Sequence, residues 1–179
     1  MHKLENPARL AELQPCATLE KLGLRDGMAF ADIGAGTGIF TTAAAEIPHA
    51  PIYAIDPSAG MREILESKKN ALALDTVEIL PDVSAMAGQS VDLALLCTVL
   101  HEIDEQEAFL TQIAAQLKPA GKLAVIEFHK YQTSYGPPPA IRISPEDVLR
   151  LAAPAGLCES ERFTLGESYD CLVLQKCNR

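Results

Sequence analysis

The sequence of 179 residues lacks a long apolar run, and this absence excludes a membrane-spanning helix. Its longest apolar stretch, from Leu93 to Leu100, has the length of a strand, whereas a helix that crosses a bilayer needs about 20 apolar residues. The first ten residues, MHKLENPARL, contain no apolar stretch long enough for a signal peptide. We therefore expect a soluble, cytoplasmic protein without a membrane span.

Positive charge is also scarce. Lys and Arg total 15 against 24 Asp and Glu, which gives a net charge of −9. Lys68 and Lys69 are adjacent, but no longer basic run is present. This balance disfavours a general affinity for nucleic acid or for anionic membranes. The oligomeric state stays open.

Paired cysteine motifs are absent too. The five cysteines are irregularly spaced and form no C-x-x-C: Cys16, Cys97, Cys158, Cys171 and Cys177. An odd number without regular spacing disfavours both a disulfide framework and a zinc site. We expect reduced cysteines that serve in packing, and no metal ion.

The composition that is present, 48% apolar and 22% charged residues, is that of an ordinary globular domain. The length is that of one domain with a real hydrophobic core. Apolar runs alternate with helical stretches, and this pattern predicts a parallel sheet with helices on both faces. We therefore predict an α/β fold, a Rossmann-like three-layer sandwich around a seven-stranded, mostly parallel sheet.

The predicted elements follow from apolar runs, caps, prolines and glycines. Two short helices, separated by Pro15, precede the first strand. Strands are predicted over residues 28–33, 52–56, 77–80, 91–97, 122–128, 161–165 and 171–175. Helices are predicted over residues 38–46, 58–67, 104–117 and 144–153. The turn 166–168 makes the last two strands a hairpin, which requires an antiparallel C-terminal strand.

The chain divides into four parts of a single domain on this interpretation. They are an N-terminal helical segment (1–27), a ligand-binding core (28–127), a long loop (128–143), and a final helix with the terminal hairpin (144–179). Unstructured loops of this length inside a compact domain are usually functional or disordered.

The strongest motif is ADIGAGTG over residues 31–38, where a buried strand turns into a helix. Its glycines allow a sharp turn and leave no side chain between the backbone and a ligand, and the helix start offers free amide donors. Ile39 stands where the dinucleotide pattern G-x-G-x-x-G needs glycine. The Gly-Lys-Ser/Thr of a phosphate loop is absent.

Three acidic residues lie near the ends of predicted strands: Asp32 two residues before Gly34, Asp56 at the end of the second strand, and Asp82 after the third. In an open parallel sheet these strand ends face one crevice. Each carboxylate alone could cap a helix or lie in a solvated loop. Together they suit a cationic ligand with hydroxyl and amino groups better than a pyrophosphate.

With these motifs the chain resembles the class I S-adenosylmethionine-dependent methyltransferases, from about residue 22 to residue 175. The segments that carry the resemblance are FADIGAGTG (30–38), AIDPS (54–58), LPDVS (80–84), VDLALLCTVLHEI (91–103) and LKPAGKLAVIE (117–127). Within that superfamily it is similar to the small-molecule branch with the ubiquinone/menaquinone C-methyltransferases and the arsenite methyltransferases. The resemblance implies S-adenosylmethionine as cofactor and S-adenosylhomocysteine as product.

The resemblance assigns cofactor contacts to ten positions: Asp32, Gly34, Ala35, Gly36, Gly38, Asp56, Pro57, Asp82, Val83 and Cys97. The glycine-rich backbone would pass beside the methionine part and the ribose. Asp32 and the backbone carbonyl of Cys97 would bind the ammonium group. Asp56 would accept the ribose hydroxyls, with Pro57 against the adenine. The adenine amino group would bind Asp82.

The implied reaction is an in-line displacement at a methyl group, in which positioning and exclusion of water supply most of the catalysis. A general base is needed only where the acceptor must lose a proton. His101 and Glu127, at the ends of two strands, are the candidates. Both could instead be capping or packing residues. The loop, with His129, Tyr131 and Tyr135, could cover the acceptor or be a solvated connection.

Competing functions stay open at this point. A nicotinamide-dependent oxidoreductase could use the same crevice, although Ile39 and Asp32 count against it. A non-catalytic relative could bind the cofactor without turnover, and methylation of a protein or RNA is a further alternative. Arsenite is disfavoured as acceptor because Cys16 and Cys97 have no obvious third partner. The quinone enzymes are longer and carry more helical material over the acceptor.

Overall fold

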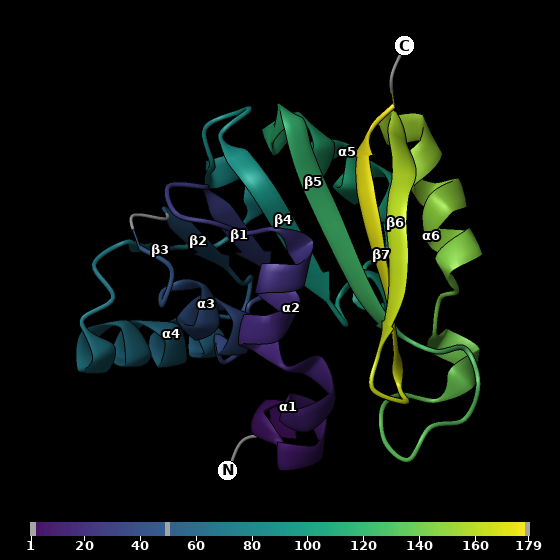
Figure 1. Cartoon of the computed structure of the whole chain (residues 1–179), viewed down its shortest axis with the longest axis horizontal. Coiled ribbons are helices and arrows are strands. Elements are labelled where there is room, and N and C mark those ends of the chain that lie inside the picture. Colours follow the sequence, from purple (N-terminus) through teal and green to yellow (C-terminus); the bar gives the residue numbers. More distant parts are fainter. Residues whose placement is uncertain (1–2, 49–50, 178–179) are drawn as a thin grey trace.

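The computed structural model describes residues 3–48 and 51–177. These residues form a seven-stranded sheet in the order β3-β2-β1-β4-β5-β7-β6 (Figure 1). The strands are β1 (Phe30–Ile33), β2 (Ile52–Ile55), β3 (Val77–Leu80), β4 (Val91–Cys97), β5 (Leu117–Phe128), β6 (Leu157–Leu165) and β7 (Tyr169–Lys176). The first five strands pair in parallel, and β7 lies antiparallel to both β5 and β6. The predicted fold class is confirmed.

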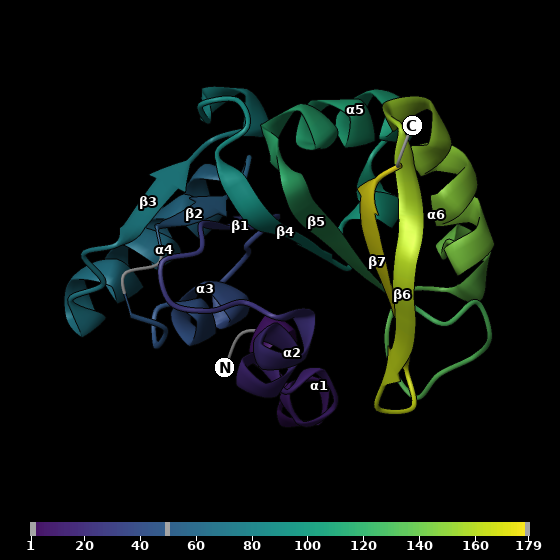
Figure 2. The same ribbon diagram turned by 45° about the horizontal axis from the view of Figure 1, so that its top comes forward.

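Helices cover both faces of the sheet (Figure 2). The first face carries α1 (Pro7–Leu13), α2 (Pro15–Leu22), α3 (Ile39–Ala44) and α4 (Ala59–Leu72). The other face carries α5 (Gln106–Gln116) and α6 (Pro145–Ala152). Short 3-10 turns span Lys3–Glu5, Val83–Ala85, Leu100–Glu102, Pro139–Ile141 and Ala153–Ala155. None of the described helices is long and apolar enough to cross a bilayer.

Two hydrophobic clusters hold these layers together, one on each face of the sheet. The central strand β1 supplies both, because successive side chains of a strand point to opposite faces. Phe30 packs with the α2 and α3 side, whereas Ala31 and Ile33 pack with α5 and α6. All four residues of β1 are buried, as expected for a parallel strand covered on both faces.

Local signals place the helix ends. Asn6 caps α1 by accepting a hydrogen bond from the Ala8 amide, and Pro15 opens α2. Ser144 and Asp147 form a capping box at the start of α6. β1 begins two residues later than predicted, and the Ala29 amide donates to the side-chain carboxylate of Asp92 in β4 instead of to a backbone carbonyl.

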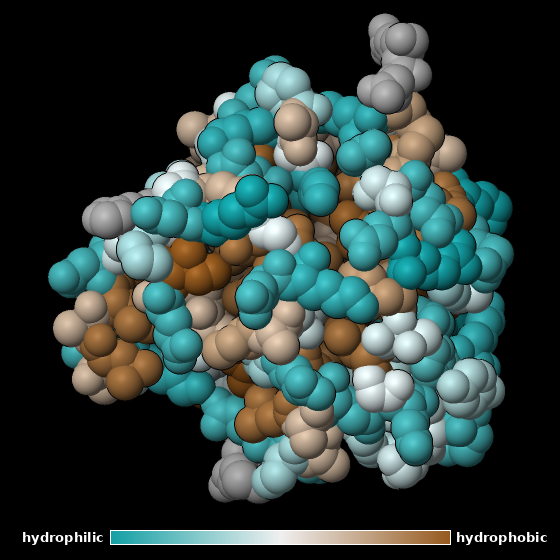
Figure 3. Space-filling view, in the orientation of Figure 1, coloured by the Kyte–Doolittle hydropathy of each residue, from teal (hydrophilic) through white to brown (hydrophobic). Residues whose placement is uncertain are grey.

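The hairpin strands β6 and β7 are longer than predicted. Most of β6 is exposed at the sheet edge, so its polar residues give little apolar signal in the sequence. Figure 3 shows mainly hydrophilic residues over this side of the molecule. Charged side chains on an edge strand oppose pairing with another sheet, which keeps the exposed edge of β6 from acting as a template for aggregation.

The cysteine prediction is wrong for two residues. Cys158 at the start of β6 and Cys177 after β7 form a disulfide, with their Cα atoms 5.2 Å apart. The antiparallel register of the hairpin brings the two residues together, and a spacing of 19 residues gave no sign of it. Cys16, Cys97 and Cys171 are free. Among residues 3–48 and 51–177 no cluster of His, Cys, Asp and Glu could hold a metal ion.

Candidate active site

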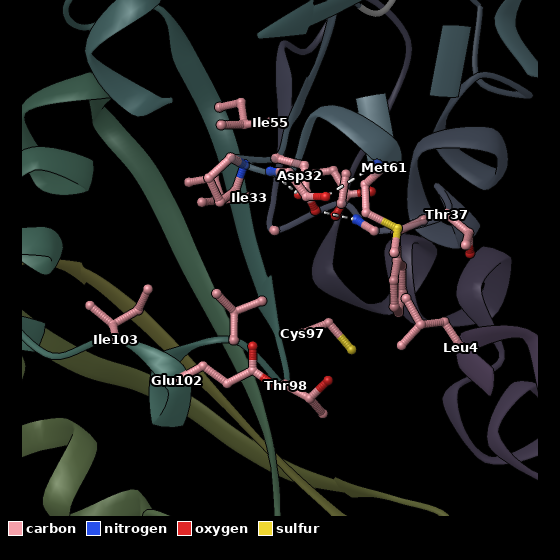
Figure 4. Close-up of a pocket in the computed structure, with 18 of the residues that line it drawn as sticks. Leu4, Asp32, Ile33, Thr37, Ile55, Met61, Cys97, Thr98, Glu102 and Ile103 are labelled. Carbon is pink, nitrogen blue, oxygen red and sulfur yellow. Dashed lines mark hydrogen bonds between the residues drawn. The ribbon is translucent and has the colours of Figure 1, made fainter. Parts of the chain in front are cut away.

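A cavity of about 1070 Å³ lies at the carboxyl ends of β1, β2 and β4. It is lined by ten of the twelve residues predicted for the site: Asp32, Gly34, Ala35, Gly36, Asp56, Pro57, Asp82, Val83, Cys97 and His101. Figure 4 shows Asp32 in the upper part of the view, Cys97 below it, and Thr98 and Glu102 in the lower part. The volume is above the roughly 300–1,000 Å³ of a site for one drug-sized ligand, so it offers room for a cofactor and a small acceptor.

The glycine-rich turn forms one wall. Gly34 has a φ of +74°, and a Cβ atom there would come within 2.3 Å of a Val99 methyl group. Only glycine lets the turn lie against the chain that follows β4. Gly38 is not among the cavity-lining residues; it precedes α3, and a Cβ there would meet Leu65 of α4.

Asp32 projects from β1 into this wall and is buried. Its carboxylate accepts a hydrogen bond of 2.6 Å from the Thr41 hydroxyl of α3. Burial disfavours the charged form and raises the pKa of Asp32 to about 6. A cationic group in the cavity would stabilise this carboxylate, which makes Asp32 suited to bind an ammonium ion. The nearby Thr37 hydroxyl is buried without a hydrogen-bond partner in the described structure, so a polar ligand can satisfy it.

Asp56 connects the end of β2 to the glycine-rich turn. One carboxylate oxygen accepts from the Gly36 amide at 2.9 Å, and the other accepts from the Ser58 amide at 2.9 Å. Each oxygen can accept a further hydrogen bond. The carboxylate therefore fixes the turn and still has acceptor capacity for a pair of hydroxyl groups.

Asp82 and Val83 lie at the end of β3, at the rim of the cavity. The Asp82 carboxylate is exposed and accepts hydrogen bonds from the amide and the hydroxyl of Ser84. These hydrogen bonds lower the pKa of Asp82, so it stays charged. Val83 lines the same cavity and is buried.

Cys97 ends β4 in a buried position. Burial raises the pKa of its thiol to about 12, so the group is a neutral thiol at physiological pH. A neutral thiol is a poor nucleophile.

Arg9 is a residue of the site that was not predicted from the sequence. This residue of α1 reaches the cavity, where its guanidinium donates to the Thr98 hydroxyl at 3.1 Å and lies 3.7 Å from the Cys97 sulfur. Its Nε is buried without a protein partner in the described structure. Thr98 adopts a left-handed conformation with φ +57°, which is rare for a β-branched residue and typical of functional sites. Arg9 is 88–89 residues away from these two partners, and no local sequence pattern predicts such a contact.

His101 and Glu127 form a buried pair, as their positions at two strand ends allowed. The His101 Nδ1 lies 2.7 Å from a Glu127 oxygen, and the backbone amide of His101 donates to the other oxygen at 3.3 Å. The hydrogen bond to Glu127 raises the pKa of His101. Glu127 itself does not line the cavity; it orients the imidazole that does.

The loop after β5 divides between two cavities. Tyr135 and the neighbouring Gly136 and Pro137 line the main cavity. His129 and Tyr131 do not; they stack with centroids 4.8 Å apart beside a separate cleft of about 560 Å³. Of the three loop residues that could cover the acceptor, Tyr135 lies at the main cavity, whereas His129 and Tyr131 lie at the separate cleft.

A second arginine that sequence reasoning missed holds this loop. The Arg142 side chain is buried and donates to the carbonyl oxygens of Pro137, His129 and Tyr131 at 2.7–2.9 Å. A guanidinium has five N–H donors in a fixed plane, so one side chain can satisfy several carbonyls of an irregular segment. The buried Arg142 side chain thus holds the loop in place through its backbone carbonyls.

A parallel sheet with a glycine-rich turn and acidic residues at successive strand ends, all facing one cavity, defines the class I S-adenosylmethionine-dependent methyltransferases. The cavity fits that cofactor, since Asp32 can bind an ammonium group and Asp56 a pair of hydroxyls.

Comparisons with known proteins agree with this class. A family model described as a methyltransferase domain matches residues 31–125, and the chain belongs to this family. It is 26% identical to the ubiquinone biosynthesis O-methyltransferase of Brucella ovis over 95% of this chain and 69% of that protein. It is 30% identical to the demethylmenaquinone methyltransferase of Tropheryma whipplei over 63% of this chain and 46% of that protein.

Solved structures give the same result. The chain is similar to a SAM-dependent methyltransferase from Aquifex aeolicus, with a TM-score of 0.91, 27% identity, and 98% and 96% of the two chains covered. A 1,6-didemethyltoxoflavin-N1-methyltransferase from Burkholderia thailandensis, solved with S-adenosylhomocysteine, shares the fold with a TM-score of 0.74 and 20% identity, covering 94% and 79%. The predictions of family and cofactor are confirmed, and the nicotinamide alternative is not favoured.

Proposed function

We propose that this protein transfers the methyl group of S-adenosylmethionine to a small molecule from which His101 removes a proton. The His101–Glu127 pair at the end of β4 and β5 carries this proposal. Residues 28–127 hold the cofactor, and the N-terminal helix with the 128–143 loop surrounds the acceptor. The bound cofactor supplies an electrophilic methyl group, and the protein supplies position and proton removal.

His101 is suited to accept a proton. With Nδ1–H donating to Glu127, the neutral imidazole presents Nε2 as an acceptor, 3.8 Å from a Glu102 carboxylate oxygen. The negative charge of Glu127 stabilises the imidazolium that forms after proton transfer, which makes His101 a stronger base. Glu127 is the positioning partner, and His101 is the residue at the cavity.

The acceptor end of the cavity favours a flat, partly apolar molecule. Phe128 and Tyr135 line it with ring centroids 5.8 Å apart, and Ile103 and Pro137 add apolar surface. The named relatives act in ubiquinone biosynthesis and on demethylmenaquinone. A phenol or quinol fits both the aromatic lining and a base at His101, so an aromatic hydroxyl compound is the proposed acceptor class.

The cofactor contacts form part of the proposal. Asp32 and the Cys97 carbonyl bind the ammonium group, Asp56 binds the ribose hydroxyls, and Asp82 with the Val83 amide binds the adenine. Arg9 binds the carboxylate of the methionine part, because its guanidinium lies beside Cys97 and Thr98 and has a buried Nε without a protein partner in the described structure.

Calorimetric titration with S-adenosylhomocysteine tests the cofactor site. We expect micromolar one-to-one binding to the wild type and no binding of NADH. Asp56→Ala should weaken the binding at least tenfold, because it removes both the hydroxyl acceptor and the anchor of Gly36. The exposed Asp75→Ala is the matched control and should bind as the wild type does. An unchanged affinity of Asp56→Ala would contradict the proposal that Asp56 binds the ribose hydroxyls.

The buried state of Asp32 gives a pH dependence. Its pKa of about 6 means that the free protein loses this negative charge as the pH falls through 6. We therefore expect the affinity for S-adenosylhomocysteine to fall below that pH, while Asp32→Asn binds weakly with a flat profile. The control ligand 5′-methylthioadenosine, which has no ammonium group, should show no such loss. Parallel pH profiles of the two ligands would contradict the role of Asp32.

The proposed location is the cytoplasm, and the disulfide offers a check. Thiols in the cytosol of most organisms are kept reduced, so Cys158 and Cys177 would be free there. Mass spectrometry after alkylation of freshly lysed cells counts the free thiols of the chain directly. A protein that keeps the bond in the cell would instead point to an oxidising compartment.

A further inference from the structure

Glu12 of α1 joins three segments that are far apart in the sequence. Its Oε1 accepts from the Tyr135 hydroxyl at 2.8 Å and from the Ser168 hydroxyl at 3.0 Å. Its Oε2 accepts from the backbone amides of Glu167 at 2.9 Å and Ser168 at 2.8 Å. One carboxylate thus connects the N-terminal helix, the loop after β5 and the turn between β6 and β7.

The contact is closely fitted on the turn side. Gly166 has a φ of +56°, and a Cβ atom there would lie 2.4 Å from the Glu12 Oε2. The partner Ser168 is buried. A carboxylate has about four acceptor positions, and here four donors occupy them. All acceptor positions of the Glu12 carboxylate are thus in use, whereas a solvent-exposed contact between a helix and a loop leaves some of them to water.

The same contact connects two walls of the main cavity. Arg9 lies three residues before Glu12, a spacing that places both side chains on one side of α1. Arg9 lines the cavity from the helix, and Tyr135 lines it from the loop. The ring of Tyr135 also packs edge-on against Phe128, which lines the acceptor end. Displacing Glu12 would therefore release Tyr135 on one wall and detach from the loop and the turn the helix that carries Arg9 on the other.

We propose that Glu12 is a positioning residue whose carboxylate holds Arg9 and Tyr135 over the cavity as one unit, so that ligands exchange only when this contact opens. The proposal rests on the proposed function, because it takes the cavity as the cofactor and acceptor site. Glu12 acts through Arg9 and Tyr135 and does not touch the ligands itself.

Hydrogen exchange and the dissociation kinetics of S-adenosylhomocysteine test the proposal. Glu12→Ala should raise amide exchange in residues 7–13 and 129–143 together and speed dissociation about tenfold, since it removes several hydrogen bonds of about 1 kcal/mol each. Glu12→Gln should restore most of the wild-type behaviour, because its amide can accept from the turn and donate to the two hydroxyls. The exposed Glu20→Ala on α2 is the control and should change neither quantity.

Gly166→Ala provides an independent variant, because it displaces the Glu12 carboxylate without changing it. It should reproduce the effects of Glu12→Ala, and it decides the question if Glu12→Ala does not fold. Unchanged dissociation, or faster exchange in only one of the two segments, would overturn the proposal. Failure of the wild type to bind S-adenosylhomocysteine would instead contradict the proposed function. In that case the exchange data alone still decide whether Glu12 couples the segments.

Discussion

Replacing His101 by Ala should lower the turnover of a phenolic acceptor by about 10²- to 10⁴-fold, the usual contribution of a general base. The affinity for S-adenosylhomocysteine should be unchanged, because the imidazole faces the acceptor end of the cavity. Initial rates and calorimetry on the same preparation separate the two effects. His129→Ala is the matched control: this histidine is also paired with a carboxylate, Asp170, at 2.8 Å, but lies outside the main cavity.

The dependence of the activity on pH gives a second test of His101 as the base. The base must be neutral to act, and the pKa of His101 is raised by Glu127. Activity should therefore be lost as the pH falls through a value above 6.5, the ordinary histidine pKa. Glu127→Gln removes the charge that stabilises the imidazolium, so the acidic limb should move to lower pH and the maximal rate should fall. A limb that stays in place in Glu127→Gln would contradict the pairing.

Arg9→Ala should weaken the binding of S-adenosylhomocysteine by roughly 10- to 100-fold, which is the effect of losing a hydrogen-bonded charge worth about 1.5–3 kcal/mol. The loss of affinity should occur only with a ligand that carries the amino acid carboxylate. 5′-Methylthioadenosine has the same nucleoside but no amino acid portion, so Arg9→Ala should bind it as the wild type does. Calorimetric titration of both ligands gives the comparison.

Arg9→Lys separates charge from geometry at this position. An ammonium group keeps the charge but lacks the planar pair of donors that matches a carboxylate, so we expect an intermediate affinity. An equal loss for both ligands in Arg9→Ala would contradict a carboxylate contact. It would indicate instead that Arg9 supports the end of β4 through Cys97 and Thr98.

The parts of the site that the sequence predicted are those built from local signals. Asp32 is the last residue but one of β1 and Asp56 directly follows β2, and parallel strands bring their carboxyl ends to one edge. The apolar run of β4 gave its bounds correctly, Val91–Cys97, because the strand is covered on both faces. His101 and Glu127 were predicted separately from two such strand ends, and their contact follows from the pairing of β4 with β5.

The parts that could not be predicted depend on contacts between distant segments. Arg9 lies on a short helix whose placement over the sheet is set by burial of Leu13, and no spacing in the sequence encodes it. Arg142 is surrounded by loop carbonyls, a role that has no residue pattern. The Cys158–Cys177 bond needed the register of a hairpin whose outer strand is polar.

The contacts of Glu12 bear on the order in which the parts of the ligand site form during folding. They join residues 155–156 positions apart, and Tyr135 is 123 positions away. Loop closure over such distances comes late, after local contacts have formed. During synthesis, α1 leaves the ribosome long before the turn at residues 166–168 exists. A nascent chain can therefore assemble β1 to β4 with their acidic residues while Glu12 still lacks its partners Tyr135, Glu167 and Ser168.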